Sequence, residues 1–246
     1  MCQWYEPKQK EGGVMATRCL VLLSGGLDST AALLAARRSF DEVSALGFRY
    51  GQPSADQELV AASTTAHNLG VRFDRRQLVG AIEPGGIMKG APDGLAVAPV
   101  VVPMRNTIFL SVAAGFGVSL WGGEPFSIGV GCNADDAAFD DCRRTFFGAM
   151  STAMTLASGV QIGVWAPYVD TPKRQIVEFV DAAGELDTLS RSWSCYRGGK
   201  APCGQCRACL VREESFAGVG VHRDLGAHPL AMTGGDPARD AALGLK

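Results

Sequence analysis

Four cysteines near the end of the chain have a type and spacing that point directly to metal chemistry. Cys195, Cys203, Cys206 and Cys209 form the pattern C-x7-C-x2-C-x2-C. Four thiolates at such spacing can surround one tetrahedral zinc ion, and a full coordination sphere would make that zinc structural rather than catalytic. Cysteines at similar spacings also hold iron–sulfur clusters, which stay an alternative. The cluster therefore predicts a metal site and favours zinc.

A second chemical group lies near the beginning of the chain, where an apolar run leads into Ser24-Gly25-Gly26-Leu27-Asp28-Ser29 and then into helix-forming residues. Glycines let the backbone turn tightly and approach a bulky anion. The helix that follows would direct unpaired N–H groups at that anion. Asp28 would cap the helix or help to hold Mg²⁺, which prefers oxygen ligands. The segment is neither of the two common glycine-rich nucleotide motifs. A phosphate-binding loop is favoured over a plain strand–helix turn.

Composition limits the classes of protein to which the chain can belong. It has 246 residues, 47% of them hydrophobic and 20% charged, with a formal net charge of -2. These values are typical of a globular α/β protein. Nucleic acid is not an expected direct partner, because no strongly basic stretch stands out. A membrane span is not expected either, because no apolar run reaches roughly 20 residues. The N-terminus lacks the apolar centre of a secretory signal, so the expected location is cytoplasmic.

The elements that must position these groups alternate along the chain. Strands are predicted at 18–23, 43–48, 71–78, 126–130 and 160–166. Helices are predicted at 29–38, 55–68, 105–121, 139–157 and 172–183. Such alternation predicts an α/β fold with a doubly wound, mainly parallel sheet, followed by a small C-terminal zinc-binding region. The stretch 80–99, rich in glycine and proline, is interpreted as a long loop.

These patterns divide the chain into four parts. Residues 1–17 form an N-terminal extension, and either Met1 or Met15 is a possible natural start. Residues 18–185 are expected to form the α/β domain with the phosphate-binding loop, and 186–225 to form the four-cysteine zinc region. Residues 226–246 form a C-terminal tail.

The hexapeptide at the first strand–helix junction resembles the S-G-G-x-D-S signature of the PP-loop ATP pyrophosphatase superfamily. Four further segments narrow the resemblance: Phe48-Arg49-Tyr50-Gly51-Gln52, Val102-Pro103-Met104-Arg105-Asn106, Phe139-Asp140-Asp141-Cys142-Arg143, and Cys195-Tyr196 through Pro202-Cys203-Gly204-Gln205-Cys206-Arg207-Ala208-Cys209. In this order, and with the loop, they look like the 7-cyano-7-deazaguanine synthase family over residues 18 to 215.

This resemblance implies an ATP-dependent carbon–nitrogen ligase of queuosine or other deazapurine biosynthesis. Its substrates would be 7-carboxy-7-deazaguanine and ammonia, and its cofactors ATP, Mg²⁺ and Zn²⁺. The carboxylate would be adenylated, ammonia would displace AMP to give an amide, and activation of the amide oxygen would lead to the nitrile. The resemblance also suggests a homodimer.

The resemblance further implies which residues form the site. Those expected to bind ATP are Leu23, Ser24, Gly25, Gly26, Leu27, Asp28, Ser29, Thr30, Tyr50, Gly51, Gln52, Arg105, Asn106 and Lys173. Those expected to bind the deazapurine are Asp135, Asp136, Asp141, Cys142 and Arg143. Asp28, Arg105 and Lys173 are the expected catalytic residues. For some of these the alternatives stay open: helix capping by the Asp135-Asp136 pair, a solvated helix face for Arg143, and a buried structural thiol for Cys142.

The chain departs from the family pattern at three places. Pro53-Ser54 stands where the family usually has Arg-His, Met104 stands at a usual glycine, and the E-T-D-like segment reads Cys132-Asn133-Ala134-Asp135. These departures motivate a second hypothesis, a repurposed relative that stops at the amide or joins the base carboxylate to an amine of a macromolecule. Two further hypotheses are a PP-loop tRNA-modifying enzyme that inserts sulfur and a degenerate ATP-binding or zinc-stabilised interaction module.

Overall fold

A parallel sheet lies at the centre of the protein, whose computed structural model describes residues 17–78, 80, 102, 104–136 and 139–219. Most of the predicted N-terminal extension, the predicted long loop and the whole predicted tail lie outside the described residues.

The sheet has five strands, and every neighbouring pair is parallel. The strands are β1 (Arg18–Leu22), β2 (Glu42–Arg49), β3 (Arg72–Gln77), β4 (Phe126–Gly129) and β5 (Ile162–Trp165). Their spatial order is β3-β2-β1-β4-β5, so the chain moves outward from β1 to β3 and then returns to add β4 on the other side of β1. The prediction of a doubly wound parallel sheet is confirmed. In such sheets ligands bind beyond the carboxyl ends of the strands where the order reverses, which here is between β1 and β4.

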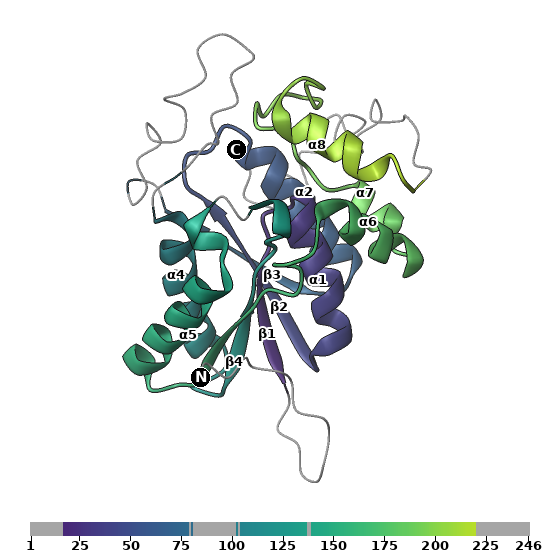
Figure 1. Ribbon diagram of the computed structural model, residues 1–246. Helices are drawn as coiled ribbons and strands as arrows, with labels where there is room; N and C mark the ends of the chain where they lie inside the picture. Colours follow the sequence, from purple (N-terminus) through teal and green to yellow (C-terminus); the bar gives the residue numbers. More distant parts are fainter. Residues whose placement is uncertain (1–16, 79, 81–101, 103, 137–138, 220–246) are drawn as a thin grey trace.

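Helices cover both faces of this sheet (Figure 1). They are α1 (Leu27–Ser39), α2 (Ala55–Asn68), α4 (Arg105–Leu120), α5 (Arg144–Ser158), α6 (Lys173–Ala182), α7 (Leu186–Ser190) and α8 (Arg207–Phe216). The pair α4 and α5 packs on one face, while α1 and α2 pack on the other, with α6 and α7 in contact with α1 and α8 against α6.

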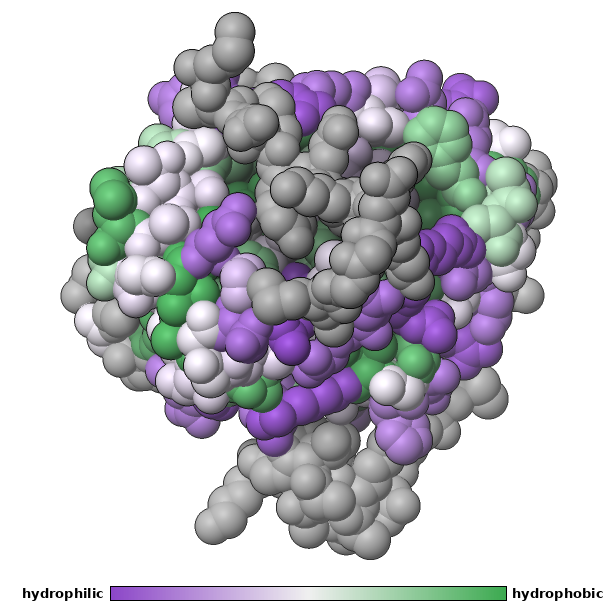
Figure 2. Space-filling model, turned by 90° about the horizontal axis from the view of Figure 1, so that it is seen from below, coloured by the Kyte–Doolittle hydropathy of each residue, from purple (hydrophilic) through white to green (hydrophobic). Residues whose placement is uncertain are grey.

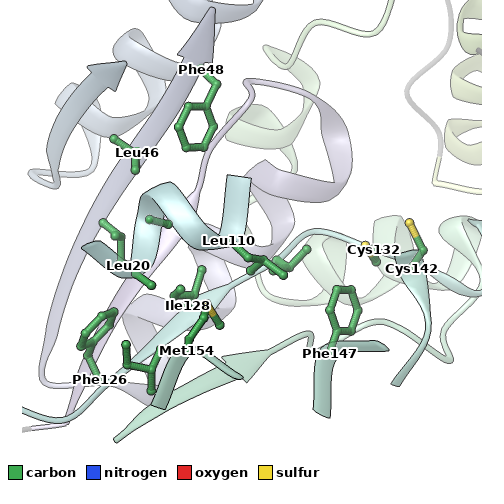
Figure 3. Packing of buried hydrophobic residues seen from close by; sticks show 14 of the residues in the cluster. Leu20, Leu46, Phe48, Leu110, Phe126, Ile128, Cys132, Cys142, Phe147 and Met154 are labelled. Atoms are coloured by element: carbon green, nitrogen blue, oxygen red, sulfur yellow. The ribbon is translucent and has the colours of Figure 1, made fainter. Parts of the chain in front are cut away.

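Strand β1 is buried on both sides, as a central parallel strand must be. Leu20 faces the cluster under α4 and α5, where Figure 3 shows it with Leu46 and Ile128. Its neighbours Cys19 and Val21 point the other way, into the cluster beneath α1 and α2. The alternation explains why this strand is apolar from Cys19 to Leu22, and it fixes where the loop after β1 emerges.

Two helix predictions need correction. The helix predicted at 139–157 begins only at Arg144, because Asp140–Cys142 forms a separate 3-10 turn. The side chain of Asn106 donates a hydrogen bond of 3.0 Å to the Asp141 carbonyl, so a tertiary contact uses the oxygen that a continuous helix would need. Beyond residue 183 no helix was predicted, whereas the structure has α7 and α8. Both lie in the cysteine region, where the sequence has no clear helical period.

Within the described residues, no helix is long and apolar enough to cross a membrane. The face in Figure 2 mixes hydrophilic and hydrophobic residues, and no continuous hydrophobic band crosses the area that the grey atoms leave visible.

Met104, just before α4, has the left-handed backbone conformation that glycine adopts most easily, with a φ of 60°. A Cβ atom in this region costs of order 1–3 kcal/mol. Met104→Gly removes that strain, but it also makes the unfolded chain more flexible. We expect a net gain of about 0.5–1 kcal/mol in the free energy of unfolding, measured by urea denaturation. Met104→Ala keeps the Cβ atom and is the matched control, because the Met104 side chain is 63% exposed. Equal stability of the two variants would contradict the prediction.

Candidate active site and metal site

The loop after β1 has the geometry of an anion cradle. Ser24 and Ser29 lie with their hydroxyls 3.0 Å apart, and the Ser29 hydroxyl also donates to the Gly26 carbonyl at 3.1 Å. Helix α1 begins directly behind them at Leu27, with no side-chain cap on its first turn. Because no N-cap side chain takes them, N–H groups of its first turn can bind an anion. The predicted capping role of Asp28 is wrong, since Gly26 occupies the capping position.

Gly25 is required for this loop to fit against α2. Its φ is +84°, and a Cβ atom placed there would lie 2.2 Å from the Glu58 carbonyl oxygen and 2.8 Å from the Ala62 nitrogen. Both obstructing atoms belong to the backbone, so they cannot move aside cheaply. The carbonyl of Gly25 accepts a hydrogen bond of 2.8 Å from the Trp193 N–H, which ties the loop to the cysteine region.

Charged side chains from three loops meet at the carboxyl ends of β1, β4 and β5. Lys173, the first residue of α6, places its ammonium 3.1 Å from the Asp28 carboxylate. Asp136, in the turn after β4, is close enough to raise the pKa of Lys173 together with Asp28, although burial opposes the lysine charge. A cation at a helix N-terminus is unfavourable by itself. The partnership with these two carboxylates explains why Lys173 is nevertheless at this position.

Asp28 retains coordinating capacity after it has paired with Lys173. Its Oδ1 atom is buried and forms no hydrogen bond with the described residues. Burial raises the pKa of the Asp28 carboxyl, and the charge of Lys173 opposes that rise. Burial likewise raises the pKa of Asp136, with Asp28 adding to the effect. An unsatisfied carboxylate oxygen beside a second carboxylate suits a small divalent cation such as Mg²⁺, which takes oxygen ligands.

Arg105, the first residue of α4, lies close to the hydroxyl of Tyr50, the residue that follows β2. Burial opposes the guanidinium charge, but Tyr50, Asp141 and Cys142 together keep the pKa of Arg105 above its usual range. Burial raises the pKa of Tyr50, and Arg105 is the largest influence against that rise. Arg105 is thus a permanently charged, largely buried group, which is the kind of side chain that pairs with phosphate or carboxylate.

Asn106 and Cys142 connect α4 to the turn before α5. The Asn106 amide donates to the Asp141 carbonyl at 3.0 Å and lies 3.5 Å from the Cys142 sulfur. Cys142 and Cys132 are both buried, and Figure 3 shows them next to each other. The sulfur of Cys142 is also the main cause of the raised pKa of Cys132. The predicted site residues of α4 and of the F-D-D-C-R segment are therefore neighbours in space.

Three predicted site residues have other contacts. Asp135 accepts a hydrogen bond of 3.1 Å from the Lys173 N–H and so caps the start of α6, the alternative considered for it. Arg143 is half-exposed and points to Asp140 at 3.4 Å. The amide of Gln52 is hydrogen-bonded to the Phe48 carbonyl, the Tyr50 N–H and the Glu58 carboxylate. Direct ligand binding by these three residues stays a prediction.

Sequence reasoning missed Glu58, a half-buried carboxylate beside the site. Its oxygens accept hydrogen bonds from Ser54 at 2.7 Å and from Gln52 at 3.1 Å. Burial raises the pKa of Glu58, because desolvation outweighs these bonds and the charge of Arg105. Nothing in its helical sequence signals this position, because burial beside the loop after β2 depends on how α2 packs.

Tyr196 belongs to the cysteine-containing segment of the family resemblance, but the sequence predicts no role for it. Its ring is 51% exposed, and it directly follows Cys195. Burial raises the pKa of its hydroxyl, with Lys173 acting against the rise and Asp136 adding to it. The side chain therefore lies at the rim of the charged group formed by Lys173, Asp136 and Arg105.

The raised pKa of Glu58 predicts a pH dependence of stability. Below about pH 4.5, its ordinary pKa, the carboxyl is protonated in both the folded and the unfolded states. As the pH rises towards and through the higher folded-state pKa, the unfolded chain loses the proton first, so folding stability falls. We expect Glu58→Gln to become increasingly stable relative to the parent protein from about pH 4.5 upward, measured by urea denaturation at a series of pH values.

A matched control is Glu178→Gln, which alters an exposed ion pair with Arg174. Such pairs contribute about 0.2–1 kcal/mol, so this variant should follow the parent protein closely. A stability difference between Glu58→Gln and the parent that stays constant across the pH series would contradict the assignment.

The four cysteines meet in one place, as predicted. Their sulfur atoms all lie within 4.8 Å of one another, with Cys206 and Cys209 at 3.5 Å and Cys203 and Cys209 at 4.0 Å. Tetrahedral zinc with bonds of about 2.3 Å requires sulfurs roughly 3.8 Å apart, so the arrangement fits such an ion. The backbone N–H groups of Gln205 and Cys206 overcome the effect of burial and lower the pKa of Cys203 to about 6. A stable thiolate at neutral pH favours metal binding.

Together, the parallel sheet, the glycine loop at its switch point and the cysteine cluster define an α/β protein of the ATP pyrophosphatase type. The family model described as "Queuosine biosynthesis protein QueC" matches residues 18–220. The chain therefore belongs to the QueC family.

Individual relatives agree with this assignment. The chain is 34% identical to 7-cyano-7-deazaguanine synthase of Caldicellulosiruptor bescii, over 83% of this chain and 94% of that protein. It is 33% identical to the enzyme of the same name from Aquifex aeolicus, over 81% and 96% of the two chains. A solved 4-thiouridine synthetase–RNA complex with bound ATP is 16% identical, with a TM-score of 0.46, and the match covers 87% of this chain and 52% of that chain. The two sequence relatives are matched over nearly their whole length.

Proposed function

We propose that this protein converts 7-carboxy-7-deazaguanine and ammonia into 7-cyano-7-deazaguanine at the expense of ATP. The observation that carries the proposal is the meeting of the glycine loop, Lys173 and Arg105 at the switch point of the sheet, in a chain whose relatives bear the name of that synthase. The positive groups and the free N–H groups of α1 suit a triphosphate and a carboxylate held side by side.

The chemistry explains why the reaction needs such a site. A carboxylate is a poor electrophile because its oxygen is a poor leaving group. Attack of that oxygen on the α-phosphate of ATP releases pyrophosphate and makes the oxygen part of a good leaving group, AMP. Ammonia then displaces AMP to give the amide. Adenylation of the amide oxygen, followed by loss of AMP and of both N–H protons, gives the nitrile.

Within this scheme, the residues act mainly by positioning and neutralising charge. Ser24 to Ser29 would hold the pyrophosphate portion, and Lys173 and Arg105 would balance the charge that develops on phosphate. Asp28 and Asp136 would hold Mg²⁺, which neutralises the phosphate oxygens when it is bound. Asp141 and Cys142 lie beside Arg105 and would contact the base.

We assign the four-cysteine cluster to structural zinc rather than to a catalytic ion. Four sulfur ligands leave no open position for water or substrate. We further expect a homodimer in the cytoplasm, with residues 18–185 as the ATP-binding domain and 186–225 as the zinc region. Light scattering coupled to size exclusion would test the dimer.

A second candidate function keeps the adenylation but changes its outcome. Ser54 stands where the family usually has histidine, and here its hydroxyl is bound to Glu58 rather than offered to a ligand. A missing proton carrier at this point would favour a relative that stops at the amide or transfers the activated base to an amine of a macromolecule.

Mass spectrometry of a reaction with ATP, Mg²⁺, ammonium and 7-carboxy-7-deazaguanine separates these possibilities. Nitrile together with AMP is the expected result. Adenylate or amide alone would overturn the nitrile assignment and support the repurposed relative. No ATP-dependent product would overturn the substrate assignment, and a brown iron-containing protein that inserts sulfur into tRNA would replace it by the tRNA-modifying alternative.

A further inference from the structure

A short segment, residues 190–195, joins the phosphate loop to the cysteine cluster. In its middle, the Trp193 N–H donates to the Gly25 carbonyl at 2.8 Å. The indole N–H of the same residue donates to the Cys195 carbonyl at 2.7 Å. The ring is 1% exposed and packs with Ala61 of α2 and with Cys195 and Cys209. One tryptophan therefore contacts the loop that would hold phosphate and the residues that would hold the metal.

The same segment is held from behind by Arg212. This residue lies one turn beyond Cys209 on α8 and is 6% exposed. Its guanidinium donates to the Ser190 carbonyl at 2.6 Å, to the Ser192 hydroxyl at 2.8 Å and to the Ser194 hydroxyl at 3.3 Å. One bond reaches the backbone before Trp193, and the other two reach the hydroxyls of the residues on either side of it, so the three together restrain the direction of the Trp193 N–H.

Arg212 is a buried cation that a nearby negative charge would stabilise. In the described part of the chain, no carboxylate pairs with it; its guanidinium lies 4.8 Å from the centre of the Phe216 ring, and Cys209 is one helical turn away on α8. Burial lowers the pKa of Arg212 to about 10, so the guanidinium is still charged at neutral pH. Four thiolates around a divalent metal carry a net charge of two minus. The filled cluster would therefore supply the negative charge that the buried guanidinium lacks.

We propose that Arg212 is a positioning residue that couples metal filling of the cysteine cluster to phosphate binding by the loop. Metal binding by Cys206 and Cys209 would fix the first turn of α8, the helix that carries Arg212. Arg212 holds residues 190–194, and Trp193 then holds the Gly25 carbonyl. This inference rests on the proposed function, because it takes the loop as the ATP site and zinc as the metal.

The coupling has a measurable form, because linkage between two binding sites is reciprocal. Isothermal titration calorimetry would give the Kd for ATP with Mg²⁺ in the zinc-loaded and the chelator-treated protein. Loss of a hydrogen bond to a charged group changes binding by roughly tenfold. In the parent protein, we expect the Kd for ATP to be about tenfold lower with zinc than without it. In R212M, we expect the two Kd values to be about equal.

A matched control is R207M, which removes an exposed arginine from the same helix and should keep the parent's zinc effect. Equal ATP affinity with and without zinc in the parent protein would overturn the proposal, and so would an undiminished zinc effect in R212M. Failure of the parent protein to bind ATP in either state would instead refute the proposed function.

A second measurement uses the metal-loaded protein alone and serves if chelation or R212M unfolds the chain. R212K keeps the charge but cannot reproduce the forked set of three bonds. Hydrogen exchange at the Trp193 amide should be about tenfold faster in R212K than in the parent, and ATP binding should be weaker by a similar factor. Unchanged exchange and unchanged ATP affinity in R212K would overturn the proposal.

Discussion

Replacing Asp28 with asparagine is expected to reduce AMP formation by at least about a hundredfold while the fold and the metal content are retained. The change preserves the shape of the side chain but removes the charge that pairs with Lys173 at 3.1 Å. It also takes the negative charge from the buried, unpartnered Oδ1 oxygen that we assign to Mg²⁺, because an amide oxygen is a weaker ligand than a carboxylate oxygen. Loss of a single preorganised electrostatic contact at a reacting centre typically costs 10²–10³ in rate. The measurement is release of AMP and pyrophosphate in the presence of substrate.

A control for Asp28→Asn is Asp170→Asn, which removes an exposed partner of Arg144 outside the site. This variant should retain parent activity, because surface ion pairs contribute little. Circular dichroism and metal analysis would establish that both variants are folded. Near-parent AMP release by folded Asp28→Asn would remove Asp28 from the catalytic residues.

Replacing Cys209 with serine is expected to release the metal and to unfold the C-terminal part of the chain. Cys209 is buried, and its sulfur lies within 4.0 Å of the sulfurs of Cys203 and Cys206. It also lies one turn before Arg212 on α8. A structural zinc site is worth roughly 10–16 kcal/mol in apparent binding free energy, which is comparable with the whole stability of a domain. Metal analysis of the purified variant and its thermal midpoint are the measurements. We expect less than stoichiometric zinc and a much lower midpoint.

Cys19→Ala is the corresponding control, since Cys19 is a fully buried thiol in β1, outside the cluster. It should cost about 1 kcal/mol or somewhat more through the small cavity left behind, but keep stoichiometric zinc. Full zinc content in Cys209→Ser would mean that the metal is held by other residues, or that three ligands are sufficient. Iron instead of zinc in the parent protein would support the cluster alternative and overturn the zinc assignment.

Local sequence was sufficient for much of the fold. Helix α2 was predicted with the bounds that the structure has, and the strands were found to within two residues at each end. Apolar runs of this length and spacing can be buried only as central strands between helices. The glycine loop and the cysteine cluster were also evident, because both depend on residues close together in the chain.

The pairings within the site were decided only by the tertiary structure. Lys173 and Asp28 are far apart in the sequence. They meet because Asp28 follows β1 and Lys173 follows β5, and these parallel strands end at the same edge of the sheet. The late start of α5 has a similar origin, because Asn106 of α4 takes the Asp141 carbonyl. Helical pattern alone could not predict a competing hydrogen bond from another element.

Local sequence was thus enough to identify the fold class, the glycine loop and the cysteine cluster, since backbone propensity, burial pattern and short-range spacing are local properties. The three-dimensional packing was needed to show which charges face one another, that Glu58 is half-buried beside the loop, and that Trp193 and Arg212 link the loop to the cysteine region. These contacts join residues distant in sequence, and their free energies depend on packing and desolvation, which no local pattern contains.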